Sequence, residues 1–322
     1  MNLRRLASCC LLPTLLCGHA LAQTAAQVPA SCPPQAQQPT AQQLQAGVRN
    51  ARDHGFLWRI SKDGHDSYLY GTVHVAKLEW AFPGPAVQQA LEASDTVALE
   101  LDMLDPDVQR RMGDAVKAQT SESLPEPLQR RIDRLASAEC VPAAALAPLV
   151  PELQVATLMT LTARRDGLDP SWGIDIVLAG WGRRAKMSVV SLETPELQLK
   201  TLQLENRKEM LEFVGSALDE LESGRARPAL RRIAQVWADS DLEALDHYES
   251  WCDCVKTEAD RAAMVRMVDD RNPALAQSIE ALHAEGKSVF AAVGSLHMTG
   301  ALGLPALMAT RGFQVVRVAY RR

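Results

Sequence analysis

Residues 68–74 read YLYGTVH and residues 289–297 read VFAAVGSLH, and these two stretches decide the fold. In each, an apolar, β-forming run leads to a glycine and, after two more residues, to a histidine. Such runs are typical of buried strands. A glycine at a strand end lets the backbone turn sharply and approach a ligand. His74 and His297 would then lie at the edge of a sheet, where imidazole can bind a metal or transfer a proton.

Four more β-forming runs complete the predicted sheet. Residues 56–61 and 66–75 flank the pair Asp63–Gly64, which is a strong hairpin signal. Helical patterns separate the other runs and fill most of residues 106–285. The sequence therefore predicts an α/β (α+β) fold with a mixed central sheet wrapped by helices. The expected strands are 56–61, 66–75, 96–101, 186–193, 288–293 and 314–319, with a helix over 300–311.

Two glutamates each end an apolar strand-like run. Glu100 follows residues 97–99 and Glu193 follows residues 189–192. Ligands of open α/β sheets bind outside the carboxyl ends of the strands. Glu193, which precedes Thr194 and Pro195, would also suit a helix cap. With the two histidines, the glutamates make a set of nitrogen and oxygen donors that suits zinc, manganese, cobalt or iron(II).

An arginine and an asparagine follow the acidic pair at residues 269–270. In one interpretation, Asn272 caps a helix that begins at Pro273 and Arg271 forms a surface ion pair. In the other, Arg271 binds a carboxylate or an oxyanion, for which its planar fork is suited. Asp175 is a further polar candidate. The remaining histidines beyond residue 22 are expected at the surface: His54, His65, His247 and His283.

Several function classes are disfavoured by the sequence. It contains no Gly-x-Ser-x-Gly elbow, phosphate loop or dinucleotide-binding glycine motif. Lys and Arg number 34 and Asp and Glu 39, for a net charge of −5. Because there is no basic stripe, nucleic acid is not an expected partner. Beyond the first 22 residues, no segment is apolar over the length of a membrane span.

The first 22 residues have the layout of a secretory signal peptide. Arg4 and Arg5 precede an apolar run over 6–16, and residues 20–22 (ALA) form a small-x-small cleavage site. A lipoprotein signal ending at Cys17 is an alternative, although Leu16 stands where a small residue is typical. Cleavage would remove two arginines and change the net charge to 32 − 39 = −7. We expect a periplasmic or secreted protein.

Residues 23–45 are rich in Gln, Ala and Pro and are predicted to be a disordered linker. Residues 46–322 then form a single domain. Four cysteines remain after cleavage: Cys32, Cys140, Cys252 and Cys254. In an oxidising compartment they favour two disulfides, with three pairings open. The single residue between Cys252 and Cys254 is too short a spacing for a zinc knuckle.

The motifs, taken in order, resemble those of the TraB/PrgY/GumN family. LWRI at 57–60 and YLYGTVHV at 68–75 resemble its N-terminal signature. ALEL at 98–101, GID at 173–175, SLET at 191–194, DRN at 270–272 and VGSLHMTG at 293–300 follow in the family's order. The resemblance covers nearly all of the chain after the predicted linker. It implies the fold of Tiki proteins, erythromycin esterases and ChaN, with a metal-dependent site at strand ends.

The resemblance also implies the chemistry of that site. Animal Tiki relatives are metalloproteases that use manganese or cobalt, PrgY-like members act on peptide pheromones, and GumN-like members are associated with polysaccharide gene clusters. By this resemblance, His74, His297, Glu100 and Glu193 bind a divalent ion (Mn, Co or Zn), and Glu100, Glu193 and Arg271 are the catalytic groups. The segments around Cys140 and Cys252 depart from the family pattern, which we expect to affect accessory structure only.

The sequence thus predicts an exported metal-dependent hydrolase, a peptidase that acts on a peptide or small polymer. Which glutamate binds the ion and which acts as the base stays open. The main alternative is a non-catalytic module of the GumN type that binds a peptide or a glycan. A haem- or iron-handling protein, by analogy with ChaN, ranks last because it would need the same two histidines as axial ligands.

Overall fold

The structure is a computed structural model of the 322-residue chain, and it describes residues 32–119, 123–204, 206–252, 254–255 and 257–320. The predicted signal peptide (1–22) and the predicted linker up to residue 31 lie outside the described residues. The chain from residue 33 onward forms one compact unit.

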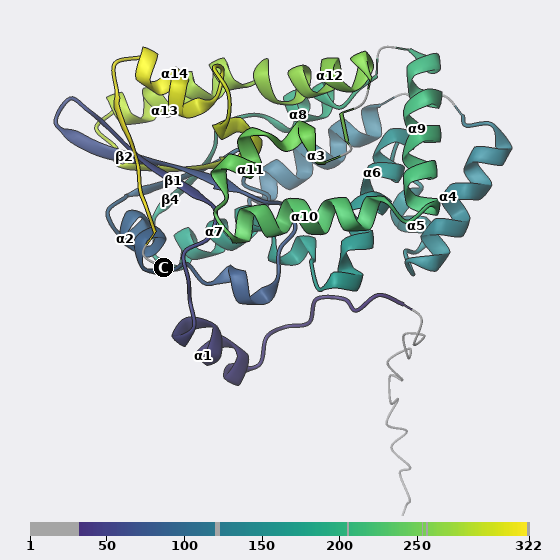
Figure 1. Cartoon of the computed structure of the whole chain (residues 1–322), viewed down its shortest axis with the longest axis horizontal. Helices are drawn as coiled ribbons and strands as arrows, with labels where there is room; N and C mark the ends of the chain where they lie inside the picture. Colours follow the sequence, from purple (N-terminus) through teal and green to yellow (C-terminus); the bar gives the residue numbers. More distant parts are fainter. Residues whose placement is uncertain (1–31, 120–122, 205, 253, 256, 321–322) are drawn as a thin grey trace, which may run out of the picture. The chain divides into compact units, whose positions relative to one another are not determined.

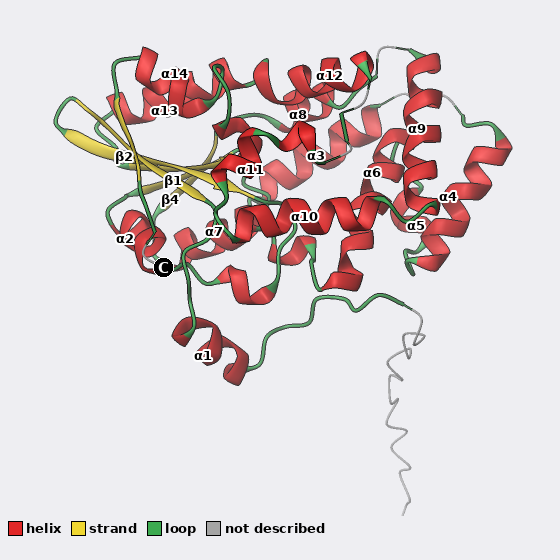
Figure 2. Ribbon diagram, in the orientation of Figure 1, coloured by secondary structure: helices red, strands yellow, loops and turns green. Residues whose placement is uncertain are grey.

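A six-stranded mixed sheet forms the centre of this unit (Figures 1 and 2). The strand order is β4-β3-β5-β2-β1-β6. The first four of these are mutually parallel, and β1 pairs antiparallel with both β2 and β6. The predicted fold class is therefore confirmed. The strands are β1 (Phe56–Lys62), β2 (His65–Thr72), β3 (Thr96–Leu99), β4 (Ser188–Ser191), β5 (Val289–Gly294) and β6 (Gln314–Arg317).

The hairpin between β1 and β2 forms as the sequence predicts. Lys62 pairs with His65 across a two-residue turn. Asp63 and Gly64 both have positive φ, 52° and 85°. This is the left-handed backbone that a tight hairpin turn requires and that an Asp-Gly pair adopts readily.

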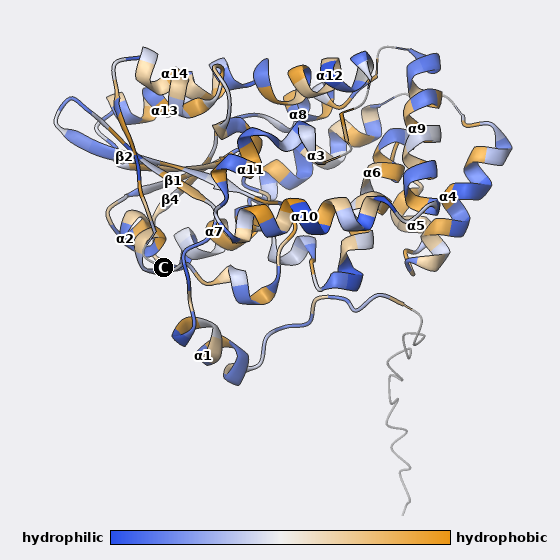
Figure 3. Cartoon of the chain, in the orientation of Figure 1, coloured by the Kyte–Doolittle hydropathy of each residue, from blue (hydrophilic) through white to orange (hydrophobic). Residues whose placement is uncertain are grey.

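Helices cover both faces of the sheet. In Figure 1, α13 and α14 lie on one side of the strands and α2 and α7 on the other. Apolar residues alternate with polar ones along helices such as α10 (Figure 3), as expected for helices with one buried face. The α-helices are α1 (Ala41–Arg49), α2 (Pro85–Glu92), α3 (Pro106–Ala118), α4 (Glu126–Ala138), α5 (Ala143–Leu146), α6 (Pro151–Leu161), α7 (Ile174–Arg184), α8 (Pro195–Thr201), α9 (Arg207–Glu222), α10 (Ala226–Ala238), α11 (Leu242–Asp246), α12 (Glu258–Met264), α13 (Asn272–Ala284) and α14 (Leu304–Thr310).

The described residues form three apolar clusters, two of them large. The largest surrounds the sheet and includes Phe290, Leu99 and Trp237, each no more than 1% exposed. The second lies among α4, α6 and α9, away from the sheet, and includes Leu158 and Val214, both fully buried. The helices that follow β3 in the sequence therefore have a core of their own. No helix in the described part of the chain is long and apolar enough to cross a membrane.

Part of the segment that we predicted to be a linker is structured. Helix α1 begins at Ala41, before the predicted domain start at residue 46. The reason is a capping box, in which the side chain of Thr40 accepts from the backbone of Gln43 and the side chain of Gln43 accepts in return. Upstream, the backbone N–H of Ala36 donates to Asp169 Oδ2 at 3.3 Å.

All four cysteines beyond residue 22 are disulfide-bonded. Cys252 pairs with Cys254. Two disulfides form, as predicted. The Cys252–Cys254 bond selects one of the three pairings that the sequence left open.

One of the predicted surface histidines was placed wrongly. His283 is 1% exposed. It lies on α13 beneath the hairpin, where its Nδ1 accepts from Ser67 Oγ at 2.8 Å and its Nε2 donates to the carbonyl of Lys62 at 3.0 Å. Both ring nitrogens are thus satisfied inside the protein, an arrangement that no local sequence pattern reveals.

Candidate functional site

Four of the predicted site residues follow the carboxyl ends of adjacent parallel strands. β2 and β5 lead to His74 and His297, and β3 and β4 lead to Glu100 and Glu193. Because these strands are parallel neighbours, their ends meet at one edge of the sheet. Thr72 pairs with Gly294 in the register of β2 and β5, so the two Gly-x-x-His frames are offset by one residue.

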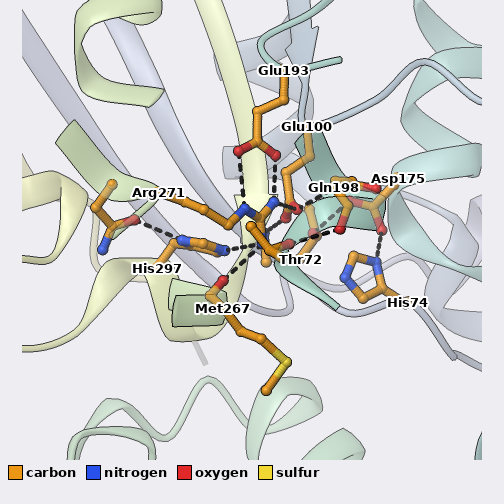
Figure 4. A network of polar contacts seen from close by, with 12 residues as sticks. Thr72, His74, Glu100, Asp175, Glu193, Gln198, Met267, Arg271 and His297 are labelled. Atoms are coloured by element: carbon orange, nitrogen blue, oxygen red, sulfur yellow. Dashed lines mark hydrogen bonds and ion pairs between the residues drawn. The ribbon is translucent and has the colours of Figure 1, made fainter. Parts of the chain in front are cut away.

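Arg271 joins the two glutamates (Figure 4). Its Nε donates to Glu193 Oε1 at 2.9 Å, and one terminal nitrogen donates both to Glu193 Oε2 and to Glu100 Oε2, the latter at 2.5 Å. Glu100 and Glu193 are buried and Arg271 is mostly so, with side-chain exposures of 7%, 1% and 11%. Burial alone would lower the pKa of Arg271, but the two carboxylates raise it above its ordinary value. The interpretation of Arg271 as a surface ion-pair partner is therefore wrong.

Glu100 has partners at both carboxylate oxygens. Its Oε1 accepts from the backbone N–H of Gly294 at 2.7 Å, and its Oε2 accepts from Gln198 Nε2 at 3.2 Å as well as from Arg271. Burial alone would raise its pKa. The neighbouring positive charges, that of His74 first, and the Gly294 N–H instead lower the pKa of Glu100 to about 2. Glu100 is thus an anion at any physiological pH.

His297 is a buried, neutral imidazole. It lies in the short 3-10 helix η6 (Ser295–Met298), is 4% exposed, and burial lowers its pKa to about 4. The amide of Asn272 donates to the carbonyl of Leu302 at 2.9 Å, which turns Oδ1 toward the ring, 2.6 Å from His297 Nδ1. Nδ1 therefore carries the proton, and Nε2, 3.3 Å from Arg271, presents its lone pair. Asn272 orients this histidine and is not the helix cap of the other interpretation.

His74 has the opposite electrostatic state. Its side chain is 68% exposed, and its Nδ1 donates to Asp175 Oδ2 at 2.8 Å. Thr72 Oγ1 donates to the other oxygen of Asp175 at 2.7 Å and so fixes the carboxylate. The Asp175 charge raises the pKa of His74 to about 9. Among the described residues, His74 Nε2 has no hydrogen-bond partner.

Gly294 marks the point around which the side chains converge. A Cβ on this glycine would lie 3.2 Å from Glu100 Oε1 and 3.7 Å from both His74 Nε2 and His297 Cδ2. Only the contact with Glu100 Oε1 is closer than an ordinary van der Waals contact, so a side chain at this position would press on the Glu100 carboxylate. Any larger residue here would compete with all three side chains for space.

The cluster carries a negative charge. Glu100, Glu193 and Asp175 supply three carboxylates against the guanidinium of Arg271, because His297 is neutral. The raised pKa of His74 is the response, since a proton on its ring offsets part of this charge. The described residues nevertheless contain no group of three or more His, Cys, Asp or Glu side chains already gathered as metal ligands.

Sequence reasoning missed three contributors. Gln198 supports Glu100 from α8, the backbone carbonyl of Met267 accepts from Arg271 at 2.8 Å, and Thr72 holds Asp175. Met267 belongs to a π-helical turn, η5 (Val265–Asp269), and such turns occur often at functional sites. A π-turn has no sequence signature, and single Gln and Thr residues carry none either.

The fold and this cluster define an α/β protein with a buried His–Glu–Arg site at the carboxyl edge of its parallel strands. The sequence model of the TraB/PrgY/gumN family matches residues 56–317. The chain belongs to that family, as its motifs predicted. No curated protein and no solved structure matches it significantly.

Proposed function

We propose that the chain is an exported hydrolase that uses a divalent metal ion, with a peptide as its substrate. The observation that carries the proposal is the convergence at Gly294. There, the carboxylate of Glu100 and the imidazole rings of His74 and His297 all lie within 4 Å of one point at the sheet edge where α/β proteins bind ligands.

The donors fit an ion such as manganese, cobalt or zinc. His74 and His297 are both held through Nδ1 by a side-chain oxygen, that of Asp175 or Asn272, and both present Nε2. Metal-binding histidines are oriented in this way by a second residue. Glu100, with a pKa of about 2, is suited to be a ligand and is a weak base. An ion held by these residues would polarise a carbonyl group and lower the pKa of a water molecule.

The remaining residues have roles of their own in this proposal. Glu193 is the carboxylate left for proton transfer, and the N–H groups of Arg271 would bind the oxygen on which negative charge develops. Asp175 keeps the His74 ring in place. Because Asp175 raises the pKa of His74 to about 9, His74 must release a proton before it can bind the ion.

Export is supported by the cysteines, because all four beyond residue 22 are in disulfides and such bonds persist in oxidising compartments. The peptide substrate rests on the family resemblance alone. A glycan-binding or peptide-binding module without catalysis is the alternative.

Elemental analysis of the purified protein tests the proposal first. We expect about one Mn, Co, Zn or Fe per wild-type chain, and none in His74→Ala/His297→Ala. The matched control is His247→Ala, which removes an exposed histidine outside the site. Peptide cleavage that stops with a chelator and returns with Mn²⁺ or Co²⁺ would support the hydrolase. Metal binding without cleavage of any peptide would favour the binding module, and no metal uptake by the wild type would refute the metal site.

A further inference from the structure

Arg271 makes more polar contacts than the other side chains of the site described above. Its guanidinium donates to both oxygens of Glu193 and to one oxygen of Glu100, and it lies against Nε2 of His297 (Figure 4). These are three of the four residues predicted to bind the ion. Its second terminal nitrogen also donates to the carbonyl of Met267 at 2.8 Å. One built-in cation thus contacts most of the predicted ligand set.

Arg271 and a metal ion would both bind the same atom, Nε2 of His297. Its lone pair faces Arg271 at 3.3 Å, because Nδ1 is committed to Asn272. Imidazole binds a metal only through such a lone pair. An ion that takes His297 as a ligand must therefore displace the guanidinium from this atom. It would also share Glu100 with Arg271, at a distance where two positive charges repel strongly.

The backbone next to Arg271 has features that would allow the Arg271 side chain to change position. The π-helical turn Val265–Asp269 ends two residues before it, and it supplies the Met267 carbonyl that holds the guanidinium. A π-turn contains one residue more than an α-helical turn, so its conversion to α-helix rotates the residues that follow. The 11% exposure of the side chain leaves one side of it in contact with solvent.

We infer that Arg271 is the resident cation of this site and competes with the divalent ion, so that the ion binds only after Arg271 has left His297 and Glu100. The inference rests on the proposed metal site. A site that is competent only in the fraction of molecules with Arg271 displaced binds its ion more weakly by that fraction. Arg271 therefore sets the affinity of the site for the metal ion. In the metal-free protein it compensates the negative charges of Glu100 and Glu193.

Metal affinity tests the competition without any assay of activity. Titration calorimetry with Mn²⁺ should show that Arg271→Met binds the ion roughly tenfold or more tightly than the wild type. Arg271→Lys should fall between them, since an ammonium cannot span both glutamates. The matched control, Arg111→Met, removes an arginine paired with the exposed Glu196 and should bind like the wild type. Equal or weaker binding by Arg271→Met would overturn the inference.

Displacement itself can be followed in the wild type, whose folding is not in question. The ¹⁵N resonance of the Arg271 terminal nitrogens, assigned by its loss in Arg271→Lys, reports their contacts with Glu100 and His297. We expect saturating Zn²⁺ to abolish or shift it. If zinc binds and the resonance stays unchanged, Arg271 is not displaced and the inference is wrong. If neither the wild type nor any variant binds an ion, the proposed metal site fails instead.

Discussion

Two arginine–glutamate pairs, whose glutamates are three residues apart, allow a test of how much the buried charge cluster stabilises the fold. Arg271 Nε donates to Glu193 at 2.9 Å and Arg111 Nε donates to Glu196 at 3.0 Å, and in each pair a terminal nitrogen makes a second bond. The chemistry is the same. The side-chain exposure differs, with 1% for Glu193 and 50% for Glu196.

Glu193→Gln should destabilise the protein strongly. Removing one partner of a buried ion pair typically costs about 3–5 kcal/mol because the other charge is left without compensation. Arg271 keeps Glu100 and the Met267 carbonyl, and the new amide keeps one acceptor, so we expect the lower end, about 3 kcal/mol. Because the entropy of unfolding of a unit of this size is about 0.6 kcal/mol/K, that corresponds to a fall in the melting temperature of roughly 5 °C. Glu196→Gln should leave stability almost unchanged, since exposed pairs contribute little.

Urea unfolding followed by circular dichroism measures both effects. Glu193→Gln should lower the midpoint without altering the slope, which shows that stability and not compactness has changed. Equal midpoint shifts for the two variants would refute the reasoning, because burial would then not decide the contribution of the pair.

Three further predictions concern the histidines and Gly294. Asp175→Asn should lower the pKa of His74 from about 9 toward its ordinary value of 6.5, which NMR titration of the ring can measure; an unchanged pKa would contradict the role of Asp175. Above about pH 9, where no proton competes for His74 in either protein, the same change should weaken metal binding roughly tenfold or more, because the ring loses its orienting carboxylate. In the wild type, Mn²⁺ affinity should rise with pH and level off above about 9, because below that value a proton must leave His74 before the ion can bind. Calorimetry at several pH values can measure this, and a flat profile would show that His74 is not a ligand. Gly294→Ala should fold, since its φ of −49° suits any residue, yet lose metal affinity because the added Cβ lies 3.2 Å from Glu100 Oε1; unchanged affinity would show that the ion does not bind at this point.

The strand-end positions were predictable because they depend on local patterns. Apolar runs that end at His74, Glu100, Glu193 and His297 give both the parallel strands and the site, since parallel strands present their carboxyl ends together. The hairpin at Asp63–Gly64 was predictable for the same reason, as turn chemistry is local.

Other features depend on contacts between distant segments. Arg271 lies between a π-turn and a helix, and it is buried because these elements pack against the ends of distant strands. The glutamates that it contacts lie 78 and 171 residues earlier in the chain. Nothing near residue 271 distinguishes that outcome from a surface ion pair. In α1, by contrast, a local pattern was misinterpreted. Its Gln and Ala residues suggested a linker, but both are good helix formers, and Thr40 caps the helix that they form.

A site with this many carboxylates would oppose folding if its only counter-charge were a metal ion. In zinc fingers and many small metal-binding domains, for example, the chain folds only when the metal binds. Here Arg271 and the proton on His74 already offset two of the three negative charges, which favours a fold that forms without an ion. We therefore expect the chain to stay folded in excess EDTA, with unchanged circular dichroism and a melting temperature lowered only by the lost binding energy of the ion. Unfolding by EDTA at neutral pH would show that Arg271 does not compensate the site, and both its role in stability and its competition with the ion would have to be abandoned.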